Sequence, residues 1–540
     1  MAPSHHELVQ SHQGKLMASI YDGTAKPFFL WSLFVLFGLP LLGLLVLRYN
    51  GSRYIRLAIL ALIYSVAFDI FQYRRCLLGA SGYMIGVISS YWVIWSTTLL
   101  LFNDPVKNFQ RIERRPVSTR TNSPGSFDKN ENLNAADPDD GTASLSKSSD
   151  AQRNKGLPKD PAKKYLDRNE TLVWQPYPQP FLHRLNWVFD LLVNMRGAQW
   201  NWRISPMGPL PASVQERLNP GKRDTLHELD DSEIMDPKAR LKAAFWTFIK
   251  SYLILDLLKV LMMRDPYFKG VVSPAPPPPF PFSYLQHTPI LVTLYRQFLT
   301  GYGILICLNY ATIFSPIIFL GLSIAFPNFS RAVTSVPLDA PWLYSDSFGP
   351  FLINAAEGGL AGCWGKWWHQ LFRAGFTNAS RWILSFFPEK LATKRIVRQT
   401  IVVFVAFNIS GLIHAGGSYV QIADTNPRGP LKFFFLQAVG VTIEDAFRRT
   451  ILPVLLPFPL PRWVNWTANY LFVACWLVFT GSYIADDIAR GGVWLTEPVP
   501  VSLLRWLDIG IKGDGWWCWK EPWFHSFKGK SWWDSGLMVL

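Results

Sequence analysis

The chain has few charged residues and few cysteines. Only 17% of its 540 residues are Asp, Glu, Lys or Arg, whereas soluble domains carry about 25%. Its five cysteines are widely spaced and form no CxxC pair, so the sequence predicts neither a disulfide framework nor a metal site. A GxSxG elbow, a P-loop and a GxGxxG fingerprint are also missing, which argues against serine-hydrolase, phosphate-loop and dinucleotide-binding chemistry.

Apolar and aromatic residues take the place of charge. Hydrophobic residues make up 49% of the chain and aromatic residues 15%, including 24 Trp, a composition that suits membrane interfaces. The formal net charge is +15, but Lys and Arg flank apolar segments instead of forming one patch. We therefore interpret them as basic loops beside a lipid bilayer and expect no nucleic-acid partner.

Apolar segments of nearly helical-span length recur along the chain. A helix needs about twenty residues to cross the hydrocarbon core of a bilayer. By that criterion the sequence predicts roughly eight to ten membrane spans and an all-α, polytopic integral membrane bundle. The candidate spans are 28–47, 55–71, 82–102, 243–262, 289–304, 305–326, 400–414, 433–455 and 466–484. Charges in 433–455 mean that this helix either ends near Val441 or pairs Glu444 and Asp445 with arginines.

Two segments differ from the apolar remainder. Residues 111–182 are rich in Ser, Asn, Asp, Lys and Pro and are expected to be a disordered polar loop, because they cannot bury a core. Residues 183–202 show the pattern of an amphipathic helix with Trp at its polar boundary, which is typical of a helix on the membrane surface. Residues 496–540 form a Trp-rich C-terminal tail.

One histidine lies within an apolar segment. His414 closes the candidate span 400–414, and an ionisable side chain at membrane depth usually faces a cavity or the bundle interior. Transfer of an acyl group to a hydroxyl needs a general base, an oxyanion donor and a dry site, and histidine suits the first role. Asn408 and Ser410 lie within two turns of it, and Ser410 shares its helix face. A structural hydrogen-bonding role for His414 stays open.

A second polar cluster lies about forty-five residues upstream, at 364–370. It combines three Trp with Lys366, His369 and Gln370. The alternative interpretation is an interfacial aromatic belt with a snorkelling lysine.

These two clusters resemble a known family. Residues 363–373, CWGKWWHQLFR, resemble the first signature of the wax-synthase-like branch of the membrane-bound O-acyltransferase superfamily. Residues 409–417, ISGLIHAGG, resemble its second signature, SGxxH, which holds that family's catalytic histidine. Residues 434–437 with 444–445 are similar to its next helix, and 184–202 are similar to an upstream segment of fungal members. Lys366 and Trp367 depart from the pair of arginines that the family often has.

The resemblance implies a fold, a reaction and residue roles. The fold would be an O-acyltransferase-like bundle with a transmembrane substrate tunnel, comprising N-terminal helices at 1–110 and a core at 183–495. Acyl-CoA would be the co-substrate, with no bound cofactor, and a hydrophobic alcohol would be the acceptor. His414 would be the base, and His369 would orient or polarise the thioester. The residues expected to bind acyl-CoA or acceptor are Trp364, Lys366, Trp368, Gln370, Arg373, Asn408, Ser410, Gln437 and Glu444.

Several choices of function stay open at this stage. The polar loop and the 183–202 segment favour a fungal-type acetyltransferase that acts on a terpenoid alcohol in the endoplasmic reticulum membrane, beside other membrane biosynthetic enzymes. A long-chain wax or sterol ester synthase is the alternative within the enzyme class. A transporter would use intramembrane charges such as Lys250, Asp256 and Arg296, and a non-catalytic scaffold is the third alternative.

Overall fold

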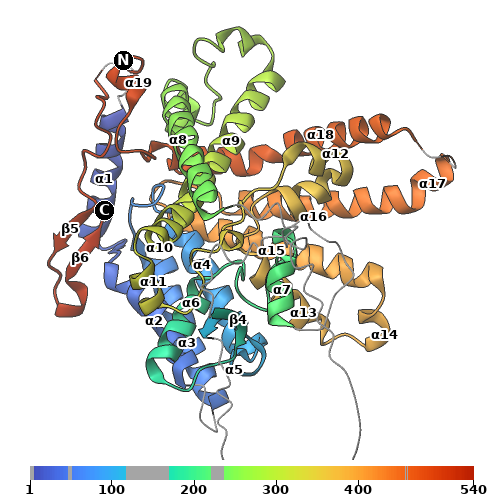
Figure 1. The fold of residues 1–540 in the computed structure, drawn as a ribbon. Coiled ribbons are helices and arrows are strands. Elements are labelled where there is room, and N and C mark those ends of the chain that lie inside the picture. The colour runs from blue at the N-terminus through green and yellow to red at the C-terminus, as the bar shows by residue number, and fades with distance from the viewer. Residues whose placement is uncertain are drawn as a thin grey trace, which may run out of the picture.

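The computed structural model describes residues 5–46, 52–116, 170–219, 236–456, 458, 460–511 and 513–540. Helices dominate these ranges, and each sheet in them has two strands (Figure 1). The protein is therefore an all-α integral membrane protein, as the composition predicts.

The N-terminal helices pack into one apolar layer. Their core contains Leu36, Ile63 and Trp95, which are almost completely buried. The helices are α2 (Leu30–Val46), α3 (Ser52–Tyr73) and α4 (Tyr83–Thr97), which continues as the π-helix η1 (Thr98–Phe102). Helix α1 (His5–Tyr21) belongs instead to a small core that joins Leu16 to Phe29 and Met538. A short parallel bridge, β1 (Lys26–Pro27) with β2 (Arg74–Arg75), ties the start of α2 to the end of α3.

A second group of helices surrounds a separate core. It contains α8 (Pro237–Met262) and α9 (Pro289–Ser315), which pack against each other and against α18 (Arg462–Arg490). The π-helix η7 (Pro316–Leu320) and α10 (Gly321–Ala325) extend α9 without a break. The prediction of two spans at 289–304 and 305–326 was therefore wrong, because this region is one apolar helical run.

The third group carries both predicted signatures. It consists of α12 (Phe351–Gly362), the π-helix η9 (Cys363–Trp367), α13 (Arg373–Leu384), α15 (Arg395–Tyr419) and α16 (Arg428–Ala446). Helix α15 lies between α4 and α16, and α16 runs beside α18 (Figure 1). Helix α16 does not end near Val441. It continues into η10 (Phe447–Ile451) and α17 (Leu452–Leu455), with Glu444 paired to Arg448 and Asp445 to Arg449.

Fewer helices qualify as spans than the sequence predicts. Among the described residues, five helices are long and apolar enough to cross a membrane, and α2 is a shorter apolar helix. Helices α8 and α16 are not among the five, although the sequence predicts a span over each. Both carry several charged residues along their length, which explains the difference. The five helices are 53–73, 83–102, 289–325, 395–419 and 462–490.

Smaller elements cover these groups. The ends of the segment predicted as a polar loop form an antiparallel pair, β3 (Arg111–Pro116) with β4 (Glu170–Gln175), and residues 117–169 lie outside the described residues. The predicted surface helix is α6 (Phe181–Val193), which ends before residue 202. The remaining α-helices in the described ranges are α5 (Pro105–Asn108), α7 (Ala212–Leu218), α11 (Pro327–Val333), α14 (Glu389–Ala392) and α19 (Leu503–Trp506).

The C-terminal tail packs against the N-terminal region. Its strands β5 (Phe524–Phe527) and β6 (Gly536–Val539) form a hairpin beside α1 (Figure 1). Met538 forms an isolated antiparallel β-bridge with Phe29, and the amide of Val539 donates a hydrogen bond to the carbonyl of Phe28. The two ends of the chain are therefore joined in one unit.

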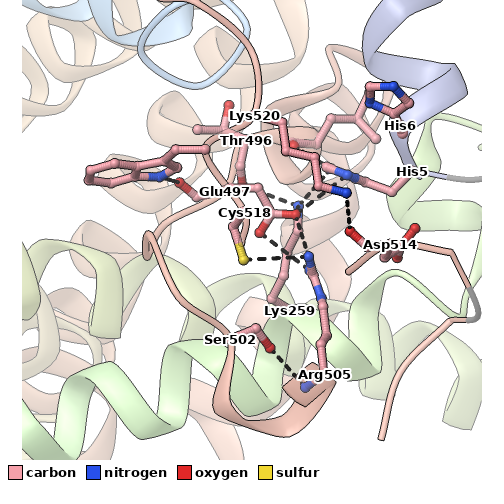
Figure 2. Close-up of polar contacts among 12 residues, drawn as sticks. His5, His6, Lys259, Thr496, Glu497, Ser502, Arg505, Asp514, Cys518 and Lys520 are labelled. Carbon is pink, nitrogen blue, oxygen red and sulfur yellow. Dashed lines mark hydrogen bonds and ion pairs between the residues drawn. The ribbon is translucent and has the colours of Figure 1, made fainter. Parts of the chain in front are cut away.

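A buried ionic cluster fixes this junction (Figure 2). The carboxylate of Glu497, in the tail, accepts a hydrogen bond from Arg505 Nη1 at 2.9 Å and lies 3.9 Å from Lys259 Nζ of α8. His5 of α1 contacts the carbonyl of Leu495 through Nε2 at 2.7 Å and the carboxylate of Glu497 through Nδ1 at 3.4 Å. Charges removed from water this way stay buried only when each has partners, so the cluster requires α1, α8 and the tail together.

This cluster makes the docking of α1 depend on pH. Burial, followed by the charge of Lys259, lowers the pKa of His5 from 6.5 to about 3. A folded-state pKa below the unfolded value gives stability that is complete above pH 6.5 and is lost as the pH falls toward 3, by at most about 1.4 kcal/mol per pH unit. We expect the amides of α1 to be less protected at pH 5 than at pH 7.5, once each exchange rate is divided by the intrinsic rate at that pH, and this pH dependence to be weaker in His5→Gln. A dependence that is the same in His5→Gln and wild type would contradict this assignment. His525→Gln, on the exposed β5, is the control.

Candidate active site

His414 lies on α15, one turn before the helix ends at Tyr419, and its ring faces the neighbouring helices. The Nδ1 atom is 2.8 Å from the hydroxyl of Tyr83, the first residue of α4. The ring of Phe434 on α16 stacks on the imidazole at a centroid distance of 4.8 Å and an angle of 14°. Three helices therefore fix the position and the plane of this ring.

Small residues bring α4 close enough for the Tyr83 contact. A Cβ added at Gly86 would lie 2.2 Å from the carbonyl oxygen of Gly416, and one added at Gly417 would lie 2.9 Å from the Tyr83 ring. Small residues let helix backbones approach in this way in membranes. The space beside Gly416 and Gly417 is taken by side chains of α4, namely Ser90, Val87 and Tyr83.

The Tyr83 contact has a chemical consequence. A neutral imidazole carries one N–H and one free lone pair. If His414 is to accept a proton at Nε2, Nδ1 must carry the hydrogen and donate it to the Tyr83 oxygen. No hydrogen bond to Nε2 is recorded in the part of the chain that the structure describes, which leaves Nε2 as the atom available to a reactant.

His369 is the second histidine of the site. It follows the π-helix η9, in the turn before α13. Its Nδ1 is buried and has no hydrogen-bond partner within the described ranges, a state that costs free energy unless a ligand supplies the partner. Burial, with a further contribution from His414, lowers the pKa of His369 to about 3. The ring is therefore neutral at physiological pH and has one N–H to donate.

Aromatic rings connect the two histidines. Trp364 lies 5.9 Å from Phe434, which stacks on His414, and 5.8 Å from Trp368. The Trp368 ring in turn lies 5.5 Å from His369. The result is a continuous aromatic wall, which favours exclusion of water from the space beside it.

Gln370 and Arg373, two predicted binding residues, instead brace the turn that carries His369. Gln370 Nε2 donates to the carbonyls of Trp364 and Trp368. Arg373 Nη1 donates to the carbonyl of Gly365 and to Gln370 Oε1. Lys366 is exposed on the same turn. Its neighbours are aromatic rather than basic, so the turn itself offers little positive charge.

Gln437 and Glu444 support the turn from α16. Gln437 is fully buried, and its amide contacts Trp364 Nε1 at 3.3 Å and Thr480 Oγ1 at 2.9 Å. Glu444 accepts the backbone amides of Leu360 and Ala361 at the kink of α12. Glycine is required at that kink: residue 359 has φ +57°, and a Cβ there would collide with the Glu444 carboxylate.

Asn408 and Ser410 lie on α15 before His414. Asn408 is exposed, and its amide donates to the carbonyl of Phe404 in its own helix at 2.7 Å. Ser410 is half-buried, one turn before His414. Ring contacts through Phe434 therefore link His414, Trp364, Trp368 and His369, and Asn408 takes no part in them.

Tyr83 was missed by sequence reasoning. The residues that resemble the acyltransferase family begin near 184, about one hundred positions after it. The available signal was weak: a tyrosine at the start of a predicted span, after the turn 79–82, where four successive residues have positive φ. No metal-binding group of three or more His, Cys, Asp or Glu occurs among the described residues.

Comparisons with known proteins find similarity to acyltransferases. The sequence model of the membrane bound O-acyl transferase family matches residues 344–436. The chain is 26% identical over 281 residues to the O-mevalon transferase yanI of Aspergillus niger, covering 49% of this chain and 53% of yanI. It is 26% identical over 270 residues to the acetyltransferase eriL of Hericium erinaceus, covering 48% of this chain and 61% of eriL.

A third relative is the acetyltransferase pyr8 of Aspergillus fumigatus, 22% identical over 339 residues, covering 61% of this chain and 70% of pyr8. The matches to yanI and eriL thus span only between half and two thirds of those proteins. No solved structure matches the chain. The segment 344–436, in which the chain is similar to the membrane bound O-acyl transferase family, contains both His369 and His414.

Proposed function

We propose that this protein is an acyl-CoA-dependent O-acyltransferase that transfers acetyl from acetyl-CoA to a hydroxyl of a hydrophobic, terpenoid-type secondary metabolite. The main support is the geometry at His414, whose Nδ1 contacts Tyr83 while no partner of Nε2 is recorded in the described chain. The family match and the acetyltransferase names of two relatives support the reaction class.

The reaction follows from the two histidines. His414 Nε2 takes the proton of the acceptor hydroxyl as its oxygen attacks the thioester carbon. His369, neutral, donates its N–H to the carbonyl oxygen as negative charge develops there. The tetrahedral adduct collapses, the carbon–sulfur bond breaks, and the CoA thiolate takes the proton from the His414 imidazolium. The aromatic wall keeps out the water that would otherwise hydrolyse the thioester.

The remaining roles are also proposals. Trp364 and Trp368 line the acyl and acceptor space. Gln370, Arg373, Gln437 and Glu444 keep the turn and its neighbouring helix in place around that space. Acyl-CoA enters from the cytosolic side of the endoplasmic reticulum membrane, and the acceptor alcohol arrives from the lipid or from other membrane enzymes.

A donor panel tests the proposed function. Microsomes from cells that express the chain receive labelled acetyl-CoA, palmitoyl-CoA or a mevalonyl thioester, with terpenoid, sterol or fatty alcohols as acceptors. We expect labelled ester from acetyl-CoA and a terpenoid alcohol, above an empty-vector control. Ester from palmitoyl-CoA and a fatty alcohol or sterol would favour the wax or sterol ester synthase alternative. The mevalonyl arm follows the name of the A. niger relative.

A further inference from the structure

A polar hollow lies where α9 meets the loop that leads into α12. Its cavity volume is about 40 Å³, room for about three water molecules and thus on the scale of a single phosphate group. Polar side chains dominate its lining, including Arg196, Arg240, Asn309, Thr312, Asp346 and Ser347. Asn309 and Thr312 lie on the long helix α9, just before it changes to the π-helix η7, and π-helical turns often mark functional sites.

The two arginines give the hollow a surplus of positive charge. Asp346, the acidic residue of the lining, pairs with Arg240 at 2.8 Å, but its side chain is 73% exposed. Burial, opposed by Asp346 and reinforced by Arg240, lowers the pKa of Arg196. Nearby, burial and the charge of Arg196 lower the pKa of Arg203 to about 10. Arg196 and Arg240 therefore share one water-exposed carboxylate, and Arg203 adds a third positive charge nearby.

Both arginines keep donors available to a ligand. Arg196 donates from Nη1 to the carbonyl of Asp346 at 2.8 Å and from Nη2 to the carbonyl of Ser345 at 2.7 Å. Arg240 donates from Nε to the carbonyl of Tyr344 and from Nη2 to the carboxylate of Asp346. A guanidinium has five N–H donors. Within the described ranges, no hydrogen bond is recorded for Arg196 Nε or Arg240 Nη1.

The hollow is connected to the proposed active site through one short loop. Ser345 and Asp346 line the hollow, and Phe348 contacts the ring of His369 at a centroid distance of 6.1 Å. The amide of Gly349 donates to the carbonyl of Trp367 at 2.9 Å, so the loop lies directly on the turn that carries His369. Three residues extend at most about 11 Å, a distance that one extended pantetheine arm bridges.

We infer that this hollow binds a phosphate group of the CoA donor through Arg196 and Arg240, with the pantetheine arm following residues 345–348 to His369. The inference rests on the proposed function. Guanidinium groups bind phosphate through paired N–H donors. The turn at 363–373 has no such pair of arginines in one hollow: Arg373 donates through Nη1 to the turn itself, and Lys366 is exposed.

The test uses a donor with phosphates and one without. Purified protein in nanodiscs is assayed with acetyl-CoA and with S-acetylpantetheine, which lacks every phosphate. We expect Arg240→Gln to raise KM for acetyl-CoA by about tenfold or more and to leave KM for S-acetylpantetheine unchanged. Arg462→Gln, which removes an exposed arginine at the start of α18, should change neither. Equal increases for both donors, or none, would overturn the inference.

Asp346→Asn separates ligand binding from loop bracing. Removing this carboxylate leaves Arg240 without a competing anion, so we expect KM for acetyl-CoA to fall about twofold or more. If the arginines only brace the loop, the same change weakens the brace and KM does not fall. Arg240→Lys keeps the charge and serves as the variant of choice should Arg240→Gln fail to fold. A partial increase in KM is expected for it, because the lysine lacks the planar fork.

A binding measurement keeps this inference separate from the proposed function. Adenosine 3′,5′-bisphosphate carries phosphates of the CoA kind but no thioester. It should raise the unfolding temperature of wild type and of His414→Ala, and have a much smaller effect on Arg240→Gln. That result supports the hollow even if no acyl transfer is found, and its absence in wild type overturns the inference. An Arg240→Gln effect that follows nanodisc lipid composition instead of the donor would assign the hollow to a lipid headgroup.

Discussion

Replacing His414 by alanine should lower the rate of ester formation by about 10²–10⁴-fold, the usual contribution of a positioned general base. No partner of the imidazole Nε2 is recorded among the described residues, while Nδ1 contacts Tyr83. The measurement is labelled ester per minute from purified protein in nanodiscs, at saturating donor and acceptor. Because the base acts on the bound reactants, the loss should appear in kcat, with KM for the donor little changed.

The matched control for this variant is His525→Ala. His525 lies on the exposed strand β5, in the tail, and its loss should leave the rate unchanged. Equal unfolding temperatures of wild type and His414→Ala would show that the helices around Phe434 are still packed. A His414→Ala protein that is folded and as active as wild type would remove this residue as the base and return weight to a structural role.

Replacing Tyr83 by phenylalanine should cost about tenfold to a hundredfold in kcat, the size of effect seen when an outer partner of a working histidine is lost. The phenylalanine keeps the ring packed against Gly417 but removes the oxygen that holds Nδ1 of His414. Nε2 is then no longer fixed in its protonation state or its direction. KM for both substrates should stay within about twofold of the wild-type value, because Tyr83 positions His414 and does not bind substrate.

Tyr91→Phe is the control on the same helix. Its hydroxyl is buried but has no hydrogen-bond partner among the described residues. Its removal should therefore leave kcat unchanged and should not lower the unfolding temperature. Equal losses of kcat in Tyr83→Phe and Tyr91→Phe would mean that any hydroxyl removed from α4 disturbs the site. In that case Tyr83 would have no special part in orienting His414.

The chemistry-bearing segments could be predicted from sequence because they break a strong pattern. A histidine in an apolar run is conspicuous, and so is a cluster of three Trp with His369. The apolar runs also predicted the position of most helices within a few residues, for example 55–71 against the observed Ser52–Tyr73. Helical periodicity and span length are local properties, so one sequence is enough to reveal them.

The contacts that complete the site could not be predicted in this way. Tyr83 reaches His414 only because Gly86 and Gly416 let two helices 331 residues apart in the chain approach closely. Arg196 and Arg240 meet across a hollow whose walls come from separate segments. The single helical run at 289–325 was divided in two because hydropathy alone gives no sign of where one continuous helix exceeds the thickness of a bilayer.

The central claim is that acyl transfer takes place between His369 and His414. The most direct test is a cryo-EM structure of His414→Ala in nanodiscs with acetyl-CoA and an accepted alcohol, in which the thioester survives. We predict that the thioester carbonyl lies within hydrogen-bond distance of His369, with the acceptor hydroxyl in the space left by the His414 imidazole. A donor whose thioester lies away from both positions would contradict the claim.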